Sequence, residues 1–241
     1  MRLTRIYQAH ALNTGQIISL SQEAAHHLIR VLRLQVGDEC IIFNGQAGEF
    51  QATIIERIKT TARVKLGEFN AINRESPLQI TLVQAILHSD KMDYLLQKAV
   101  ELGVTHVIPL LTAHSTLKLT PDRWEKRYVH WQGVMRGACE QSGRTRIPIL
   151  ENPMTFDVAM MALKAETRII LQPAAKKMLH SLPFCQRVVL CIGPEGGWSL
   201  NELDSAQKMG FQAMKMGPRV LRSETAGVVA MSLLQGLYGD L

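Results

Sequence analysis

The spacing of apolar residues divides the chain into two parts. In the first seventy or so residues, apolar and polar positions alternate over residues 38–45, 49–58 and 61–69, as in half-buried strands. Asn44 and Gly45 favour a tight turn between the first two runs. One helix is predicted from Ser21, which can cap its N-terminus, to Arg33, with Gly37 just beyond its end. Short strands joined by tight turns predict a small β-barrel.

A polar stretch over residues 70–77 ends in proline and marks a domain boundary. Beyond it, apolar runs alternate with helical patterns, which predicts a parallel sheet covered by helices on both faces. We therefore expect domains at residues 1–72 and 73–241. The predicted strands are 79–87, 105–111, 168–172, 187–192 and 211–217, and the predicted helices are 90–103, 121–141, 155–166, 201–210 and 224–239.

Composition narrows the class of protein. The 241 residues are 46% hydrophobic and 20% charged, which is typical of a soluble globular protein. The net charge of +6 is compatible with a nucleic-acid partner without requiring one. The four cysteines lie far apart and form no Cys-x-x-Cys pair, so we expect neither a metal site nor disulfides. No apolar run has the length of a membrane span or a signal core, which favours a cytoplasmic protein.

Three predicted strand ends carry unusual loops: LQP at 171–173, IGPEGGWS at 192–199 and MGPRVLRSETAG at 216–227. In open α/β sheets, ligands bind beyond the carboxyl ends of strands. Gly193, Gly196 and Gly197 would let backbone approach a ligand closely, although a plain strand-to-helix turn explains them equally well. Ser199 and Glu202 have the spacing of a capping box. The sequence contains neither a dinucleotide-binding nor a P-loop glycine motif.

The third loop favours a ligand site over a simple turn. Arg219, Arg222 and Glu224 fall within six residues, just before a helix that is apolar nearly all round. These side chains could form a salt-bridged cap, or they could hold a phosphate or a substrate base. Because a second Gly-Pro strand end accompanies them, we favour the ligand site.

The two loops together resemble the ribosomal RNA small subunit methyltransferase E family. The resemblance covers essentially the whole chain and includes HHLIRVLRLQVGD (26–38), FNGQAGEF (43–50), KMDYLLQKAVELGV (91–104) and ACEQSGRTRIP (138–148). It implies a SPOUT-class enzyme with an N-terminal PUA-like β-barrel and a C-terminal α/β domain containing a trefoil knot. It also implies a homodimer that uses S-adenosylmethionine to methylate N3 of a uridine in 16S rRNA of the small ribosomal subunit, near the decoding site. The strand and helix pattern by itself does not predict a knot.

The resemblance places the cofactor at the three strand ends. Apolar side chains there would wall the adenine, and glycine and proline backbone would supply hydrogen bonds. The expected cofactor contacts are Leu171, Gln172, Pro173, Ile192, Gly193, Pro194, Glu195, Gly196, Gly197, Met216, Gly217, Leu221, Thr225 and Ala226.

Methylation of uridine N3 requires removal of a proton or stabilisation of the resulting anion. We expect a carboxylate, Glu195 or Glu224, or a water to take the proton. Arg222 or Arg144 would stabilise the anion, because an arginine stays charged. Glu195 could instead lie near the cationic sulfonium. Through the resemblance, Glu140, Gln141 and Arg144 are candidates for the substrate pocket or the dimer interface.

RNA contacts are expected in the first domain, at Arg2, Arg5, Arg30 and Arg33. Arg30 and Arg33 are three residues apart and would share a helix face, which could also be simply solvated. Two other functions stay open. One is a non-catalytic RNA-binding or ribosome-assembly factor, and the other is a methyltransferase of the same fold that acts on another RNA or base.

Overall fold

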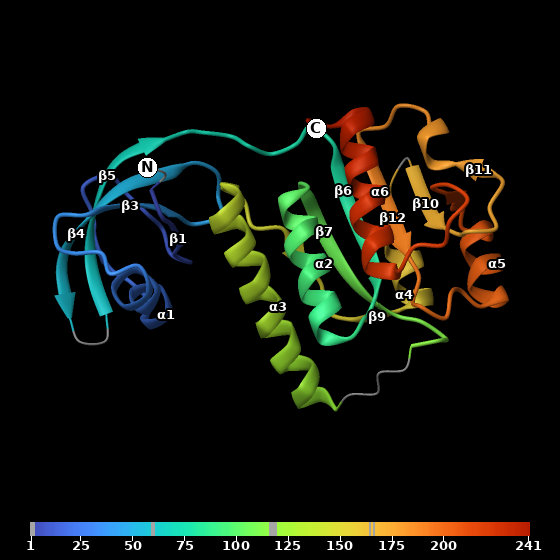
Figure 1. The fold of residues 1–241 in the computed structure, drawn as a ribbon, viewed down its shortest axis with the longest axis horizontal. Coiled ribbons are helices and arrows are strands. Elements are labelled where there is room, and N and C mark those ends of the chain that lie inside the picture. The colour runs from blue at the N-terminus through green and yellow to red at the C-terminus, as the bar shows by residue number, and fades with distance from the viewer. Residues whose placement is uncertain (1–2, 59–60, 116–119, 164, 166) are drawn as a thin grey trace. The chain divides into compact units, whose positions relative to one another are not determined.

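The computed structural model describes residues 3–58, 61–115, 120–163, 165 and 167–241. The chain forms two compact units (Figure 1). The first consists of Met1–Glu75 and Cys139–Ile147, and the second of Ser76–Ala138 and Pro148–Leu241. The predicted division after residue 72 did not include a returning segment, and its position stays a prediction. Arg2 and two positions of the predicted helix 155–166, residues 164 and 166, lie outside the described residues.

The first unit contains the predicted strands in one mostly antiparallel sheet, with the order β1-β3-β4-β5-β2. Within the part of this unit that the structure describes, only β1 and β3 pair in parallel. Alternate side chains of the strands, such as Ile42, Ile54 and Val64, are fully buried and pack with Leu28 into one core. The strands are β1 (Arg5–Tyr7), β2 (Ile17–Ser19), β3 (Glu39–Phe43), β4 (Glu49–Ile58) and β5 (Thr61–Asn70).

The predicted helix 21–33 is shorter and less regular than expected. Ser21 does cap α1 (Gln22–His26), because its hydroxyl accepts a hydrogen bond from the N–H of Ala24. A π-helical turn, η1 (His27–Val31), follows, and the chain then leaves the helix. Arg33 has a φ of 59°, in the left-handed region. The prediction that Arg30 and Arg33 share a helix face is therefore wrong.

The second unit is built on a parallel sheet with the order β11-β13-β10-β12-β6-β7-β8, with β9 pairing beside β7. Among the described residues, all strand pairs of this sheet are parallel, as the sequence predicts. The long strands match the predicted ones to within a few residues. The strands are β6 (Gln79–Ala85), β7 (Val104–Leu111), β8 (Ile149–Leu150), β9 (Met154–Thr155), β10 (Thr167–Leu171), β11 (Lys177–Met178), β12 (Arg187–Ile192) and β13 (Gln212–Lys215).

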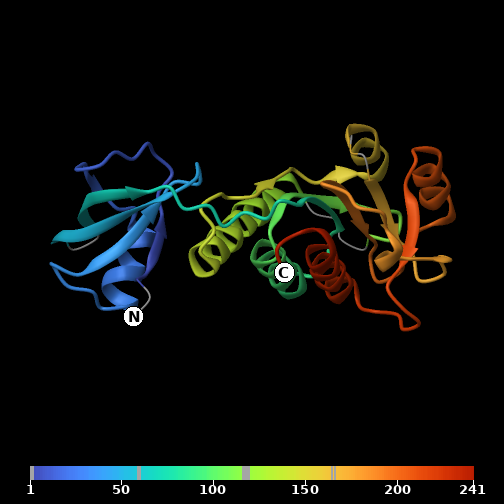
Figure 2. The ribbon, with the colours of Figure 1, turned by 90° about the horizontal axis from the view of Figure 1, so that it is seen from above.

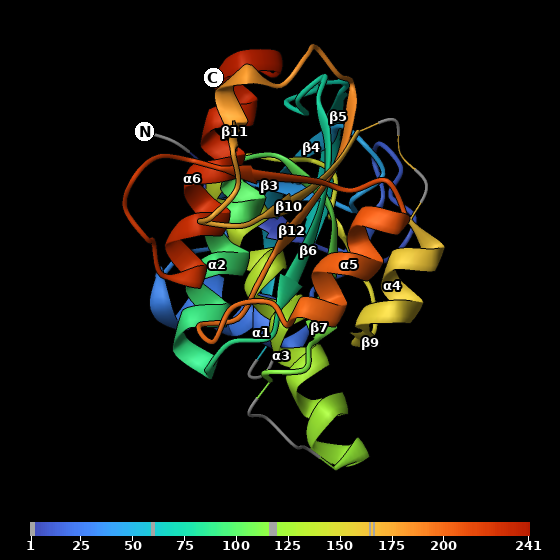
Figure 3. The same ribbon diagram turned by 90° about the vertical axis from the view of Figure 1, so that its right-hand side faces the viewer.

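Helices cover both faces of this sheet (Figure 3). On one face, α2 (Ser89–Glu101) and α6 (Ser223–Tyr238) lie side by side, as the green and red helices of Figure 2 show. On the other, α4 (Phe156–Ala162) and α5 (Leu200–Lys208) pack with the sheet around Phe156, Trp198 and Phe211. The remaining helices are α3 (Pro121–Ser142), which matches its prediction closely, and the short 3₁₀ helix η2 (Leu179–Ser181). The predicted parallel sheet with two covered faces is confirmed, whereas the knot stays a prediction.

The four cysteines are free and buried. Burial raises the pKa of the Cys40 thiol and of the Cys139 thiol to about 12, so neither is a thiolate nucleophile at neutral pH. Among the described residues, no helix is both long and apolar enough to span a membrane, and no three His, Cys, Asp or Glu side chains are grouped to hold a metal ion.

Candidate functional site

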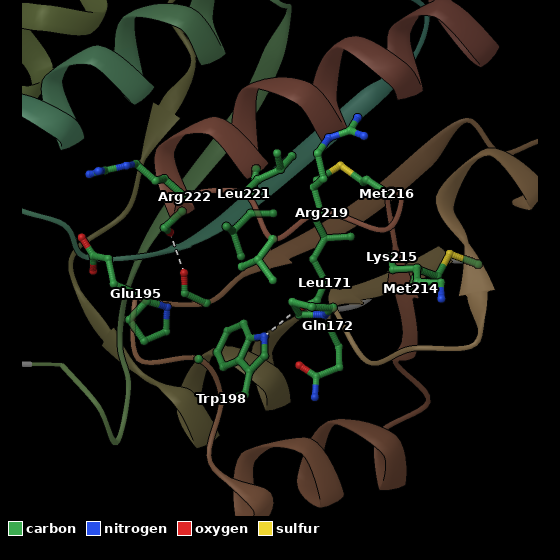
Figure 4. A pocket seen from close by; sticks show the side chains of 18 of the residues that line it. Leu171, Gln172, Glu195, Trp198, Met214, Lys215, Met216, Arg219, Leu221 and Arg222 are labelled. Carbon is green, nitrogen blue, oxygen red and sulfur yellow. Dashed lines mark hydrogen bonds between the residues drawn. The ribbon is translucent and has the colours of Figure 1, made fainter.

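The three unusual loops meet at one place in the second unit. Strands β13, β10 and β12 are neighbours in a parallel sheet, so their carboxyl ends lie at the same edge. The loops that follow them enclose a cavity of about 410 Å³, together with the N-terminal end of α6 (Figure 4). This is the position at which parallel α/β sheets bind their ligands.

Most of the predicted cofactor contacts line this cavity. The exceptions are Gly196 and Thr225. Gly196 lies against His114, whose ring Nδ1 is 3.1 Å from the Gly196 carbonyl oxygen, and Thr225 is exposed on the first turn of α6. The predicted contacts at the cavity are Leu171, Gln172, Pro173, Ile192, Gly193, Pro194, Glu195, Gly197, Met216, Gly217, Leu221 and Ala226.

The indole of Trp198 holds two of the loops together. Its Nε1–H donates a hydrogen bond of 2.9 Å to the carbonyl oxygen of Leu171, at the end of β10 (Figure 4). The ring also lies against Gly193, where an added Cβ would be 3.0 Å from the indole Cε2. A side chain at Gly193 would therefore press against the tryptophan ring, which would have to shift.

A capping box fixes the far end of the glycine loop, as the sequence predicts. Ser199 caps α5 by accepting a hydrogen bond from the N–H of Glu202, and the Glu202 carboxylate accepts one from the N–H of Ser199. The second carboxylate oxygen of Glu202 accepts from the N–H of Ala113, after β7. These bonds restrain the loop between Ile192 and Ser199 at its Ser199 end.

One lysine at the cavity connects two of the predicted catalytic carboxylates. Lys91, in the first turn of α2, places its Nζ 3.1 Å from Oε1 of Glu195 and 3.7 Å from Oε1 of Glu224. Glu195 is exposed at the cavity rim, whereas the Glu224 side chain is only 13% exposed. Among the described residues, Oε2 of Glu224 is buried with no hydrogen-bond partner.

The environment of Glu195 keeps it ionised. Partial burial raises the pKa of its carboxyl. Three influences lower the pKa by more than burial raises it: a hydrogen bond from its own backbone N–H, the hydrogen bond and charge of Lys91, and the charge of His88. The net pKa lies below the ordinary value, so Glu195 is a carboxylate at neutral pH and a weaker base than a free glutamate. This environment suits a group that faces a cation.

Sequence reasoning did not identify Lys91 as a site residue. It also missed the cavity-lining residues Met214, Lys215, Val220 and Ser223. A lysine in the first turn of an amphipathic helix has no local signal that distinguishes it from a solvent-exposed lysine. Met214 and Lys215 belong to the predicted strand 211–217, and only the order of the sheet shows that its end lies beside those of β10 and β12.

The arginines of the third loop differ in their surroundings from Arg144. Arg222 is exposed at the N-terminal end of α6, and it lines the cavity with Arg219. Arg144 belongs to the first unit, where it is buried and its guanidinium forms an ion pair with Glu75. Its backbone carbonyl accepts a hydrogen bond from Arg5. Arg144 is not among the residues that line the cavity.

The predicted RNA-contacting arginines are not equivalent. Arg5 is buried, forms an ion pair with Glu49 and lies over the ring of Phe43, so its guanidinium already has partners within the protein. Arg30 and Arg33 are exposed, and Arg30 lies at the edge of a second cavity of about 330 Å³ in the first unit. Within the described residues, the exposed Arg30 and Arg33 suit a phosphate contact better than the buried Arg5.

Comparisons with known proteins agree with this geometry. Residues 74–235 match the family model of an RNA methyltransferase domain, and residues 20–67 match that of an RNA methyltransferase PUA domain. The ribosomal RNA small subunit methyltransferase E of Buchnera aphidicola is 36% identical over 100% of this chain and 98% of its own. The enzyme of the same name from Synechocystis is 33% identical over 91% of this chain and 73% of its own.

Two solved structures extend the likeness to the cofactor. A Legionella pneumophila protein, described as a methyltransferase and solved with bound SAM, has a TM-score of 0.98 and 40% identity, with 100% of both chains covered. The ribosomal RNA small subunit methyltransferase E of Neisseria gonorrhoeae, bound to S-adenosylmethionine, has a TM-score of 0.93 and 33% identity, again over 100% of both chains.

Proposed function

We propose, because this chain belongs to the ribosomal RNA small subunit methyltransferase E family, that it transfers a methyl group from S-adenosylmethionine to N3 of a uridine in 16S rRNA. One observation carries the proposal. The cavity at the ends of β10, β12 and β13 is built from the loops that resemble the family's, in a chain that matches two S-adenosylmethionine-bound structures along its whole length.

The residues at the cavity fit this cofactor chemically. Leu171, Ile192 and Leu221 offer apolar walls to an adenine, and the glycine and proline backbone admits a ligand without side-chain bulk. Glu195 is a carboxylate at the rim and suits a sulfonium cation. When bound, S-adenosylmethionine supplies the electrophilic methyl group. Everything else in the reaction depends on how the protein orients the uridine and handles its N3 proton.

We assign different roles to Glu195, which lines the cavity, and Glu224, which does not line it but contacts the cavity residue Lys91. Glu195 is held ionised by Lys91 and acts electrostatically. Glu224 is less exposed and has an oxygen without a hydrogen-bond partner among the described residues, so it is the better candidate to accept the N3 proton. Arg222, exposed beside it, would stabilise the uridine anion. The predicted role of Arg144 at the substrate stays a proposal that its ion pair with Glu75 does not favour.

The proposal extends to how the protein contacts its RNA and to its oligomeric state. The PUA-domain match supports an RNA-contacting first unit, with Arg30 and Arg33 as phosphate contacts. Replacing both should weaken RNA binding and flatten its dependence on salt. We further propose that the protein works as a homodimer on the small ribosomal subunit in the cytoplasm, which light scattering and activity on purified subunits would check.

Mass mapping of 16S rRNA tests the function directly. RNA from cells that lack the gene should miss one methyl group on one uridine, and the purified protein with S-adenosylmethionine should restore it on small subunits. The restored methyl group should lie on N3, which fragmentation of the nucleoside shows. Unchanged 16S rRNA with a methyl group lost from another RNA would favour the same fold acting on another substrate. Saturable cofactor binding without any methylated RNA would instead favour a binding factor.

A further inference from the structure

A buried amide lies directly beneath the cavity and outside its lining. Gln84 is near the end of the central strand β6, where it pairs with Ile192 of β12, and its side chain is 0% exposed. Its neighbours along the buried strand are apolar, so a glutamine is an unusual choice there. Its Oε1 has no hydrogen-bond partner among the described residues, which costs stability.

The amide belongs to a directed chain of hydrogen bonds. Nε2 of Gln84 lies 2.9 Å from Oγ of Ser223, and that Oγ lies 2.5 Å from the carbonyl oxygen of Gly193. A carbonyl can only accept, so the Ser223 hydroxyl donates to Gly193. The hydroxyl has one proton, so Oγ accepts from Gln84. A second contact, 3.0 Å from Nε2 to the Ala85 carbonyl oxygen, also requires the NH₂ group at this position.

This series of hydrogen bonds ends at the Gly193 carbonyl, which belongs to the backbone that forms the cavity wall. Gly193 and Ser223 both line the cavity, and they come from loops that are far apart in the sequence. Pro194 has no N–H, so the carbonyl of Gly193 is the polar group by which this peptide unit can be oriented. The other side of Gly193 is in contact with Trp198. The glycine is thus held between an indole and a hydroxyl.

We propose that Gln84 is a positioning residue of the cofactor pocket, acting through Ser223 on the carbonyl of Gly193. It connects β6 to the first turn of α6 and to the glycine loop, and it sets the orientation of the Gly193–Pro194 peptide. This inference rests on the proposed cofactor site. It goes beyond that site because Gln84 does not itself line the cavity and reaches its wall only through Ser223.

The test measures S-adenosylmethionine affinity by calorimetry on the full chain, together with thermal stability. Gln84→Met keeps an unbranched side chain of similar length and removes the buried amide. We expect the affinity to fall about tenfold, as for the loss of one oriented hydrogen bond. The melting temperature should not fall correspondingly, because Oε1 is removed as well. Leu82→Met, two residues earlier on the same strand face, is the matched control and should keep wild-type affinity.

A double-mutant cycle with Ser223→Ala tests whether Gln84 acts through the hydroxyl. Both single variants should weaken binding, and the double variant should bind no more weakly than the weaker single one. Additive losses would show that the two residues act separately, and wild-type affinity in folded Gln84→Met or Ser223→Ala protein would overturn the inference. Wild-type protein that fails to bind S-adenosylmethionine would contradict the proposed function instead.

Discussion

At the scale of single residues, the proposed site depends on three charged side chains, Lys91, Glu195 and Glu224. The two proposed functions of the carboxylates are attraction of the sulfonium and removal of the N3 proton. Lys91 contacts both Glu195 and Glu224, which leaves one net negative charge in the group. The proposed cofactor carries a cationic sulfonium, which a carboxylate at the rim would attract. Because the pKa of Glu195 is lowered, its charge is present at neutral pH and is lost only as the pH falls through that lowered value.

Glu195→Gln and Glu224→Gln should therefore behave differently. Without the rim carboxylate, we expect weaker S-adenosylmethionine binding, by a similar factor across the neutral pH range, where Glu195 stays ionised. Without the candidate base, we expect methyl transfer to small subunits to fall at least about a hundredfold with cofactor affinity nearly unchanged. Calorimetry and single-turnover transfer assays separate the two effects. Full transfer activity in Glu224→Gln would rule out its role as the base.

At the scale of elements, two helices of the second unit, α2 and α5, are followed by glycines in the left-handed backbone region, which other residues rarely adopt. Gly103 follows α2 with a φ of 79°, and Gly210 follows α5 with a φ of 82°. Their surroundings differ. An added Cβ at Gly103 would be 2.7 Å from Nε2 of Gln235, which donates a hydrogen bond to the Leu102 carbonyl, whereas nothing lies within 4 Å of one at Gly210.

These two glycines form a matched pair of positions. The difference between their alanine variants measures what displacing Gln235 costs in unfolding free energy. Gly210→Ala should lower the free energy of unfolding by about 1 kcal/mol, the cost of a left-handed alanine. Gly103→Ala should cost that amount and roughly 1–3 kcal/mol more, because Gln235 must move from its hydrogen bond at the end of α2. Urea unfolding of both variants gives the difference. Equal losses would mean that Gln235 moves at no cost.

At the scale of the whole molecule, the chain leaves the first unit after Glu75 and returns to it for Cys139–Ile147. An ion pair and a hydrogen bond hold the returning segment. The Arg144 side chain, 5% exposed, pairs with Glu75, and Arg74 donates a hydrogen bond of 2.8 Å to the carbonyl of Gly143. Arg144 thus has an evident structural role at the point where two separate pieces of chain form one unit.

Glu75→Gln should reveal this structural role. It leaves the buried Arg144 guanidinium without its charged partner, and we expect a loss of up to about 3 kcal/mol in unfolding free energy. Glu56→Gln breaks the exposed pair with Arg63 and should cost less than about 1 kcal/mol. Denaturant unfolding compares the two variants. If both variants lower the unfolding free energy by the same small amount, the Arg144–Glu75 pair does not stabilise the first unit. That result would favour the predicted role of Arg144 at the substrate.

Much of this arrangement can be predicted locally. The period of two along residues 49–58 and 61–69, the caps at Ser21 and Ser199 and the glycine after α2 all act through neighbours in the chain, so their residue types suffice. The helix 21–33 was predicted too long because its end does not depend on neighbouring residues in the chain. Its pattern continues to Arg33, but the chain turns away after Val31, a change that its own residues do not signal.

The sequence by itself thus determined the longer strands, most of the helices, the two classes of domain and the three loops beyond the strands, because each rests on short-range spacing and backbone preference. Only the tertiary structure decided that Lys91 joins Glu195 to Glu224, that Gln84 supports Gly193 through Ser223, and that Arg144 pairs with Glu75. These contacts link residues between 30 and 139 positions apart. Sheet order and helix packing set such distances, and no local pattern encodes them.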